Sequence, residues 1–147
     1  MNISTRGRYA LQAMVILASN ETHEPIPLKT IAEKAGVSEG YLQQLFINLR
    51  KAGLVIGNKG SQPGYVLARE GISVGDVLRV METAFTTVDC VSDDDACPRR
   101  EGCITRNIWA GLKNEIDGFV DSISLDHLAK CYQSETDADQ GVFDYNI

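Results

Sequence analysis

The feature that most constrains the fold of this chain is a pair of short helical patterns joined by a tight turn. Residues 28–35 repeat apolar side chains every three or four positions, and Gly36 follows them as a typical helix terminator. Ser38 then precedes a longer pattern over residues 39–52, which Gly53 ends. Its apolar stripe consists of Tyr41, Leu42, Leu45, Phe46 and Leu49. This spacing predicts a helix-turn-helix unit, whose second helix enters the DNA major groove.

A β-hairpin is predicted directly after this unit. Residues 54–56 and 65–67 are short β-prone runs, and residues 57–64 between them are rich in turn-forming side chains. Lys59 is a cation near the predicted tip. A hairpin that follows a helix-turn-helix is the winged-helix arrangement, whose tip lies near the DNA backbone or a minor groove. The sequence therefore predicts a mainly α fold with a small β-hairpin.

Helices are also predicted on both sides of the winged-helix unit. Residues 5–19 form an amphipathic pattern that Ser4 or Thr5 caps, and Ser73 and Asp76 have the spacing of a capping box. We expect a fourth helix after this box.

The second half of the chain predicts a long helix that a small domain cannot cover. Residues 104–122 repeat apolar side chains every three or four positions, which predicts a helix of about 28 Å at 1.5 Å per residue. We assign this helix to self-association. A short helix over residues 125–132 and an irregular loop over residues 86–103 are also expected.

These patterns divide the chain into three parts. We expect a winged helix-turn-helix DNA-binding domain over residues 1–71 and dimerisation helices over residues 72–133, with a cysteine loop at 89–103. Residues 134–147 are expected to form an acidic tail that need not be ordered.

Length and charge narrow the function. The 147 residues suffice for one domain with an appendage, and they contain neither a secretory signal nor a membrane span, so we expect a cytoplasmic protein without membrane contact. Residues 1–70 carry eight Lys or Arg against five Glu, a net charge of +3. Residues 71–147 carry six against 15 acidic residues, a net charge of −9. A polyanion is therefore attracted to the first part only.

The exposed face of the second helix of the unit supplies candidates for base recognition. Gly40, Gln43 and Gln44 lie early in this helix beside Glu39. A glutamine can pair bidentately with the adenine edge, and a glycine lets the backbone approach closely. The alternative is that both glutamines are only soluble helix formers. Phosphate contacts, which set affinity rather than sequence choice, are expected from Arg50, Lys51 and Lys59.

Three cysteines in one polar loop form the second candidate site. Cys90, Cys97 and Cys103 lie within 14 residues, and disulfides are disfavoured in the cytosol, so the loop indicates metal or redox chemistry. Thiolates select zinc, copper(I) or iron–sulfur clusters, although the two-residue spacing of a zinc ribbon is missing. Cys131 fits a buried apolar cysteine. His23 and His127 stand alone, and we find no pair of nucleophile and base, so we expect no enzyme.

Several stretches together resemble the IscR, NsrR and CymR group of bacterial winged-helix transcriptional regulators. They are residues 7–10, 41–46, 49–55, 64–68 and 103–109. The resemblance covers residues 1 to about 132 and implies a homodimer that binds a double-stranded DNA operator, with Gly40, Gln43, Gln44 and Lys59 at DNA-contacting positions. It also implies that Cys90, Cys97 and Cys103 bind an iron–sulfur cluster of the 2Fe–2S or 4Fe–4S type.

The chain departs from the group at functional positions. Cluster-binding members have a histidine ligand where this chain has Arg106, and nitric-oxide sensors have an aspartate where it has Arg8. A guanidinium has no lone pair to offer a metal. Gln43 replaces a glutamate that discriminates between operators in cluster-binding members. The spacing between Cys90 and Cys97 is also one residue longer than in those members. The fourth ligand stays open between Asp89, Asp93, Asp94, Asp95, Cys131 and Asn107.

The leading hypothesis is a regulator whose cluster senses cluster supply, redox state or nitric oxide and acts through the spacing of the two recognition helices. One alternative is a cluster-free thiol switch that uses the same three cysteines, with Arg99 and Arg100 nearby to favour a thiolate. Another is a winged-helix module that binds a protein partner instead of DNA.

Overall fold

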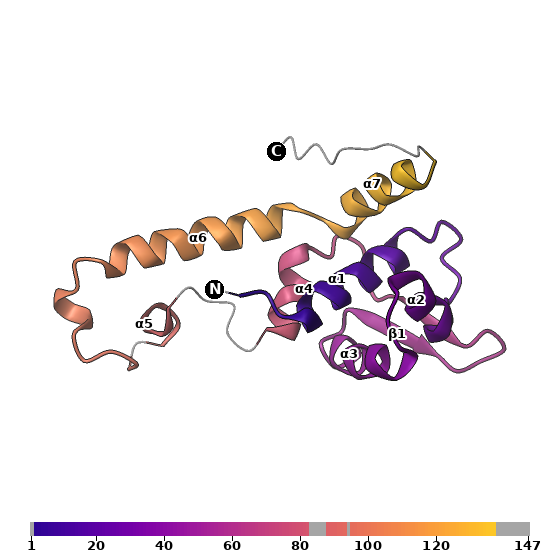
Figure 1. Ribbon diagram of the computed structural model, residues 1–147, viewed down its shortest axis with the longest axis horizontal. Coiled ribbons are helices and arrows are strands. Elements are labelled where there is room, and N and C mark those ends of the chain that lie inside the picture. Colours follow the sequence, from indigo (N-terminus) through magenta and orange to yellow (C-terminus); the bar gives the residue numbers. More distant parts are fainter. Residues whose placement is uncertain (1, 83–87, 94, 138–147) are drawn as a thin grey trace.

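The computed structural model describes residues 2–82, 88–93 and 95–137, which form a winged-helix body and a long helical arm (Figure 1). We call residues 2–82 the body and helix α6 the arm. In chain order the elements are α1 (Thr5–Ala18), α2 (Leu28–Ala35), α3 (Glu39–Lys51), β1 (Val55–Asn58), β2 (Gly64–Leu67), α4 (Val74–Met81), α5 (Asp89–Ser92), a 3-10 turn (Arg100–Gly102), α6 (Arg106–Ser122) and α7 (Leu125–Asp137). This arrangement confirms the predicted fold class.

Three of the four helices of the body begin at predicted capping residues. The Ser4 Oγ accepts a hydrogen bond from the Gly7 N–H at 3.1 Å, and the Ser38 Oγ accepts one from the Tyr41 N–H at 3.2 Å. Ser73 and Asp76 form the expected capping box. Gly36 ends α2 in the left-handed region at φ +68°, which glycine adopts without strain.

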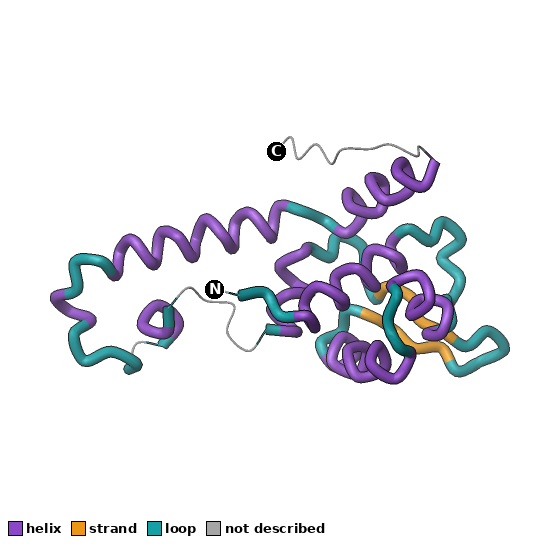
Figure 2. Tube along the Cα trace, viewed as in Figure 1, coloured by secondary structure: helices purple, strands orange, loops and turns teal. Residues whose placement is uncertain are grey.

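The hairpin is antiparallel and is extended by a short third segment. Val55 pairs with Leu67 and Asn58 with Gly64, so the register fits the predicted runs with β1 extended to Asn58 (Figure 2). Ile26, in the predicted connection between α1 and α2, exchanges two backbone hydrogen bonds with Tyr65 at 2.9 and 3.0 Å. A Cβ on Gly64 would lie 2.5 Å from the Ile26 carbonyl oxygen, so this pairing requires glycine there.

The core of the body lies between α1, α2, α3 and α4. Met14, Ile31, Leu42 and Phe46 are fully buried, and the Phe46 ring packs edge-on against Tyr65 at a centroid distance of 4.8 Å. This contact joins α3 to the base of the wing, so the hairpin and the second helix of the unit have a fixed relation.

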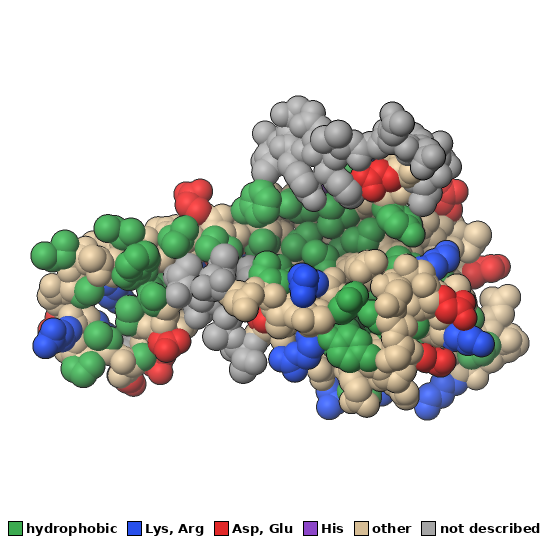
Figure 3. Space-filling view, viewed as in Figure 1, with side chains coloured by type: hydrophobic (Ala, Val, Ile, Leu, Met, Phe, Trp, Pro, Cys, Tyr) green, Lys and Arg blue, Asp and Glu red, His purple; other side chains and the backbone are tan. Residues whose placement is uncertain are grey.

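The arm leaves the body and exposes much of its apolar face. Of its residues only Val120 is buried, in a small cluster with Val74 and Leu78 of α4. Ile108 is 61% exposed, and Leu112 and Phe119 are also exposed. Figure 3 shows hydrophobic side chains along the length of the arm.

Three predictions about the second half were wrong in part. The long helix begins at Arg106, and Ile104 lies outside it with 90% of its surface exposed. The loop expected to be irregular contains α5 and the 3-10 turn. The last helix continues to Asp137 instead of ending at residue 132, because the Gln133 Nε2 donates to the Ser19 carbonyl at 2.9 Å and holds this part of α7 beside α1.

The remaining tail, residues 138–147, lies outside the described part of the chain. Among the described helices, none is long and apolar enough to cross a membrane.

Candidate nucleic-acid interface and cysteine lobe

The predicted base-reading residues lie on the surface of α3. Leu42, Leu45 and Leu49 point into the core, and this packing leaves the opposite face of the helix in solvent. The exposed face includes Glu39, Gly40, Gln43 and Gln44. Their contact with bases is a prediction that a DNA-bound structure would have to test.

A groove of about 360 Å³ lies between α3, the start of α2 and the wing. Its polar lining includes Glu39, Gln43, Arg50, Lys59 and Lys29. Three cations against one carboxylate favour a phosphate backbone over a cationic ligand. Gly40, Gln44 and Lys51 are exposed outside this groove. Figure 3 shows Lys and Arg side chains along the lower edge of the body, where Figure 1 places α3.

Lys29 is a groove residue that sequence reasoning missed. It lies in the first turn of α2, the helix that crosses the DNA backbone in a helix-turn-helix. Its position in the first turn of α2 could have indicated a DNA-backbone contact. The sequence, however, does not show that α2 begins beside the wing.

The wing presents Lys59 at the predicted place. The Asn58 side chain accepts a hydrogen bond from the Gly60 N–H at 3.0 Å, which tightens the backbone on both sides of Lys59. The lysine is exposed. It therefore lies where a cation can meet a phosphate beside the groove.

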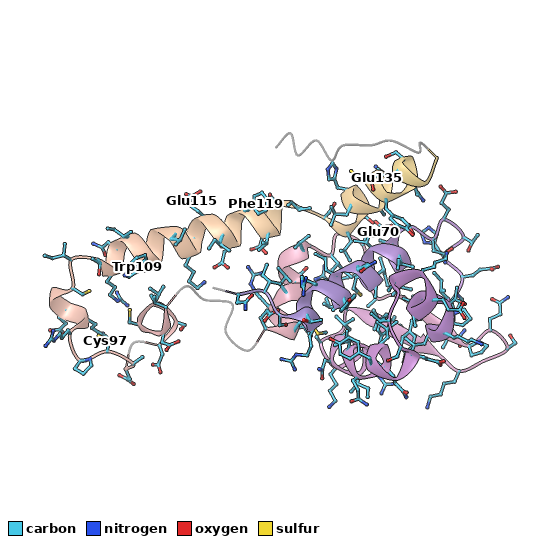
Figure 4. All side chains as sticks on the ribbon, viewed as in Figure 1. Glu70, Cys97, Trp109, Glu115, Phe119 and Glu135 are labelled. Carbon is cyan, nitrogen blue, oxygen red and sulfur yellow. The ribbon has the colours of Figure 1, made fainter. Side chains whose placement is uncertain are left out.

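The three candidate cysteine ligands share one lobe at the far end of the arm. We call the described residues among 88–105 the cysteine lobe. Cys90 lies in α5, whereas Cys97 and Cys103 flank the 3-10 turn, and all three are half-buried free thiols. Figure 4 labels Cys97 at the end of the molecule away from the body.

Cys103 has the most distinctive environment of the described thiols. Its Sγ lies 3.4 Å from the Thr105 Oγ1. Hydrogen bonds from the Thr105 hydroxyl and from the backbone N–H groups of Thr105 and Arg106 lower the pKa of the Cys103 thiol. The thiolate is the form that binds metals and also the form that reacts with oxidants.

The three thiols are ligands of the kind that an iron–sulfur cluster uses, but the structure does not bring them together at one site. Soft thiolates are the ligands such clusters use. Within the described residues, however, no three His, Cys, Asp or Glu side chains are close enough to hold one metal ion. Arg106, where the resemblance implies a histidine ligand, begins α6. The assignment of Cys90, Cys97 and Cys103 therefore stays a prediction.

The structure narrows the candidates for a fourth ligand. Cys131 lies on α7, beyond the opposite end of the arm, where its Sγ is 4.0 Å from the His127 Nε2 (Figure 1). It is therefore excluded as a ligand from the same chain, because the 17-residue arm spans about 25 Å at 1.5 Å per residue. Asp93 accepts the Asp95 N–H at 2.9 Å, and Asp94 lies outside the described residues. Asp89, Asp93, Asp95 and Asn107 remain open.

Comparison with known proteins decides the family. A model described as Rrf2, iron-dependent transcriptional regulator, matches residues 3–131. The chain belongs to the Rrf2 family. This result confirms the resemblance drawn from the sequence.

Individual relatives agree with this assignment of the Rrf2 chain. It is 35% identical over 130 residues to the HTH-type transcriptional regulator IscR of Cronobacter sakazakii, covering 87% of this chain and 80% of the relative. The structure of T. potens IscR matches with a TM-score of 0.73 and 37% identity over 99% of this chain and 95% of that one. The structure of CymR (YrzC), the global cysteine regulator of B. subtilis, matches with a TM-score of 0.72 and 36% identity, covering 88% of this chain and 97% of CymR. This Rrf2 chain is thus a DNA-binding transcriptional regulator and not an enzyme.

The environment of Cys103 predicts a measurable dependence of thiol reactivity on Thr105. Thr105→Val removes the hydroxyl that lowers the thiol pKa, so the pH midpoint of Cys103 alkylation by iodoacetamide is expected to move upward and the rate at pH 7 to fall. Thr105 makes no side-chain cap of α6, so the helix is expected to remain. Peptide mass spectrometry gives the rate, with Cys131 as internal control. An unchanged midpoint would contradict the assigned cause.

Proposed function

We propose that this Rrf2 regulator binds a specific DNA operator as a homodimer and that an iron–sulfur cluster in the cysteine lobe modulates its operator affinity. The observation that carries the DNA-binding part is the groove in which Gln43 of α3 meets Lys29, Arg50 and Lys59. A polar helix face beside several cations suits a duplex, because bases and phosphates are then reached together.

The proposal gives each residue of the interface a role. Gly40, Gln43 and Gln44 face base edges in the major groove. Lys29 joins the predicted phosphate contacts Arg50, Lys51 and Lys59. Residues 1–71 act as the DNA-binding domain, and residues 72–133 dimerise and sense.

The DNA contacts predict a separation between affinity and specificity. Lys59→Ala is expected to weaken binding to all sequences alike and to reduce the slope of log affinity against log salt by about 1, because one phosphate contact is lost. Gln43→Ala is expected to cost about 1–3 kcal/mol of discrimination at one base pair. Fluorescence anisotropy over a salt series measures both.

Lys130→Ala is the matched control, since it removes the same charge from α7. If Lys59→Ala and Lys130→Ala behaved alike, or if the protein bound operator and random duplex equally at every salt concentration, the DNA-reading role would fail. The module that binds a protein partner would then be favoured.

The homodimer is supported by the arm. Ile108, Leu112 and Phe119 form an exposed stripe whose spacing brings them to one helix face. A second copy of the same stripe is its simplest complement, because a two-fold dimer pairs identical surfaces. Self-association through α6 also spaces two α3 helices for two operator half-sites.

Disruption of the stripe predicts loss of the dimer. Leu112→Glu is expected to shift sedimentation equilibrium toward monomer and to weaken operator binding at least about 100-fold, since about 3 kcal/mol of paired burial is lost with the second half-site. Asn114→Glu introduces the same charge on the opposite side of α6 and is expected to remain dimeric. A dimeric Leu112→Glu protein would place the interface elsewhere.

The sensing role is supported by the lobe's thiols. Cys90, Cys97 and Cys103 are partly accessible, and hydrogen bonds lower the pKa of one of them. A bound cluster would supply a charge and ligand set that change with iron supply and oxidant. A fourth position taken by a weak or exchangeable ligand makes such a cluster easy to lose, which suits a sensor.

The cluster predicts a spectroscopic signature that depends on three residues. Anaerobic reconstitution with iron and sulfide is expected to give visible absorption in the parent protein and in Cys131→Ser. It should give none in the Cys90, Cys97 and Cys103 triple serine variant. Operator affinity is expected to change about 5- to 150-fold on loading, the usual range of allosteric coupling.

The cluster-free thiol switch is the second candidate, favoured by the lowered pKa of Cys103. This switch predicts that the reconstituted protein has no visible absorption and contains no iron. Its operator affinity would still depend on oxidation of the cysteine thiols.

A further inference from the structure

Helix α4 is the element that receives the arm. The Arg79 guanidinium donates to both carboxylate oxygens of Asp121 at 2.7 and 3.0 Å and to Asp117 at 3.3 Å. A Cβ on Gly75 would lie 2.0 Å from the Asp121 Oδ1. The approach of α6 to α4 therefore depends on a glycine and a bidentate ion pair.

A second contact of α4, at its C-terminal end, holds the start of α1. The Glu82 Oε1, at the C-cap of α4, accepts hydrogen bonds from the Ser4 N–H at 2.9 Å and from the Ser4 Oγ at 2.8 Å. Ser4 is also the N-cap of α1. A Cβ on Gly7 would lie 2.3 Å from the same oxygen, so this contact also requires a glycine.

Helix α1 in turn contacts the recognition helix. The Tyr9 ring packs edge-on against the Tyr41 ring at a centroid distance of 6.1 Å. Tyr41 lies in the first turn of α3, between Gly40 and the exposed Gln43. The contacts from the arm to the DNA-reading face are thus continuous.

We propose that Glu82 is a positioning residue that passes the orientation of the arm to the recognition helix through Ser4, α1 and the Tyr9–Tyr41 contact. The relay deepens the proposed function, because it names the route by which the lobe and arm act on DNA. Glu82 is also the last residue of the body. A surface link of this kind is one that a substitution can cut without leaving a core cavity.

The direct packing of α4 against α1 and α3 is the competing route. That packing belongs to the buried core, which includes Val77 and Leu49. If this core packing alone transmitted the orientation of the arm, Arg79→Ala would still change exchange in α3 after the Glu82 carboxylate was removed. Variants at Glu82 therefore separate the two routes.

Hydrogen–deuterium exchange of the full-length chain tests the relay. Arg79→Ala loosens the arm and is expected to raise exchange about fivefold at the hydrogen-bonded amides of residues 7–9 and 41–43, the effect of losing an ordinary helix cap. In the Glu82→Ala background, Arg79→Ala is expected to cause no further rise in exchange at these amides, because the Glu82–Ser4 contact is already lost. Glu82→Gln is expected to keep the response, since its amide oxygen accepts both hydrogen bonds from Ser4. In Glu82→Asp the carboxylate is one methylene shorter and is not expected to reach Ser4, so this variant should behave as Glu82→Ala does.

Glu24→Ala is the control for charge, since it removes an exposed carboxylate from the connection after α1, and it should leave the response intact. The relay is overturned if Arg79→Ala changes exchange equally in the parent and Glu82→Ala backgrounds, or changes it in neither. It is also overturned if Glu82→Gln responds as Glu82→Ala does. The readout needs neither DNA nor a cluster. Failure of regulated operator binding would therefore count against the proposed function and not against the relay.

Discussion

The short contact between α6 and α4 determines where the cysteine lobe and the apolar stripe lie relative to the exposed face of α3, the predicted DNA-reading face. It includes one small apolar cluster around Val120 and the ion pairs of Arg79 with Asp117 and Asp121. Just past the end of α6, the Val74 N–H also donates to the Ile123 carbonyl at 2.9 Å. Ion pairs this exposed contribute about 0–1 kcal/mol each. The arm is therefore held in orientation by close geometry more than by strong binding, and a modest free energy applied at its far end suffices to turn it.

The body could be predicted from the sequence because its signals are local. Ser4, Ser38 and Ser73 cap the helices that follow them, and Gly36 ends α2. Each of these signals acts within one helical turn. The stripe of α3 likewise predicted the burial of Leu42, Leu45, Phe46 and Leu49, although Tyr41 is only partly buried. By exclusion it predicted that Gln43 and Gln44 would be exposed.

The features that could not be predicted depend on polar contacts between distant segments. Ile26 joins the wing through backbone hydrogen bonds to Tyr65, and Gln133 extends α7 through a contact with Ser19. Neither leaves a periodic apolar pattern. Lys29 enters the groove for the same reason, because only the packed fold brings the start of α2 beside the wing. The three cysteines were found by spacing, but spacing does not say how closely they approach.

The exposed stripe on the arm would, in the proposed homodimer, link the chain's stability to its abundance. A single copy keeps Ile108 and Phe119 in water, and burying such surface is worth about 25 cal/mol per Å². If two copies pair through this stripe, mass action stabilises the chain more as its concentration rises. A copy without a partner would then present a surface of the kind that chaperones and proteases bind, so the fraction of copies lost would be greatest when the chain is scarce.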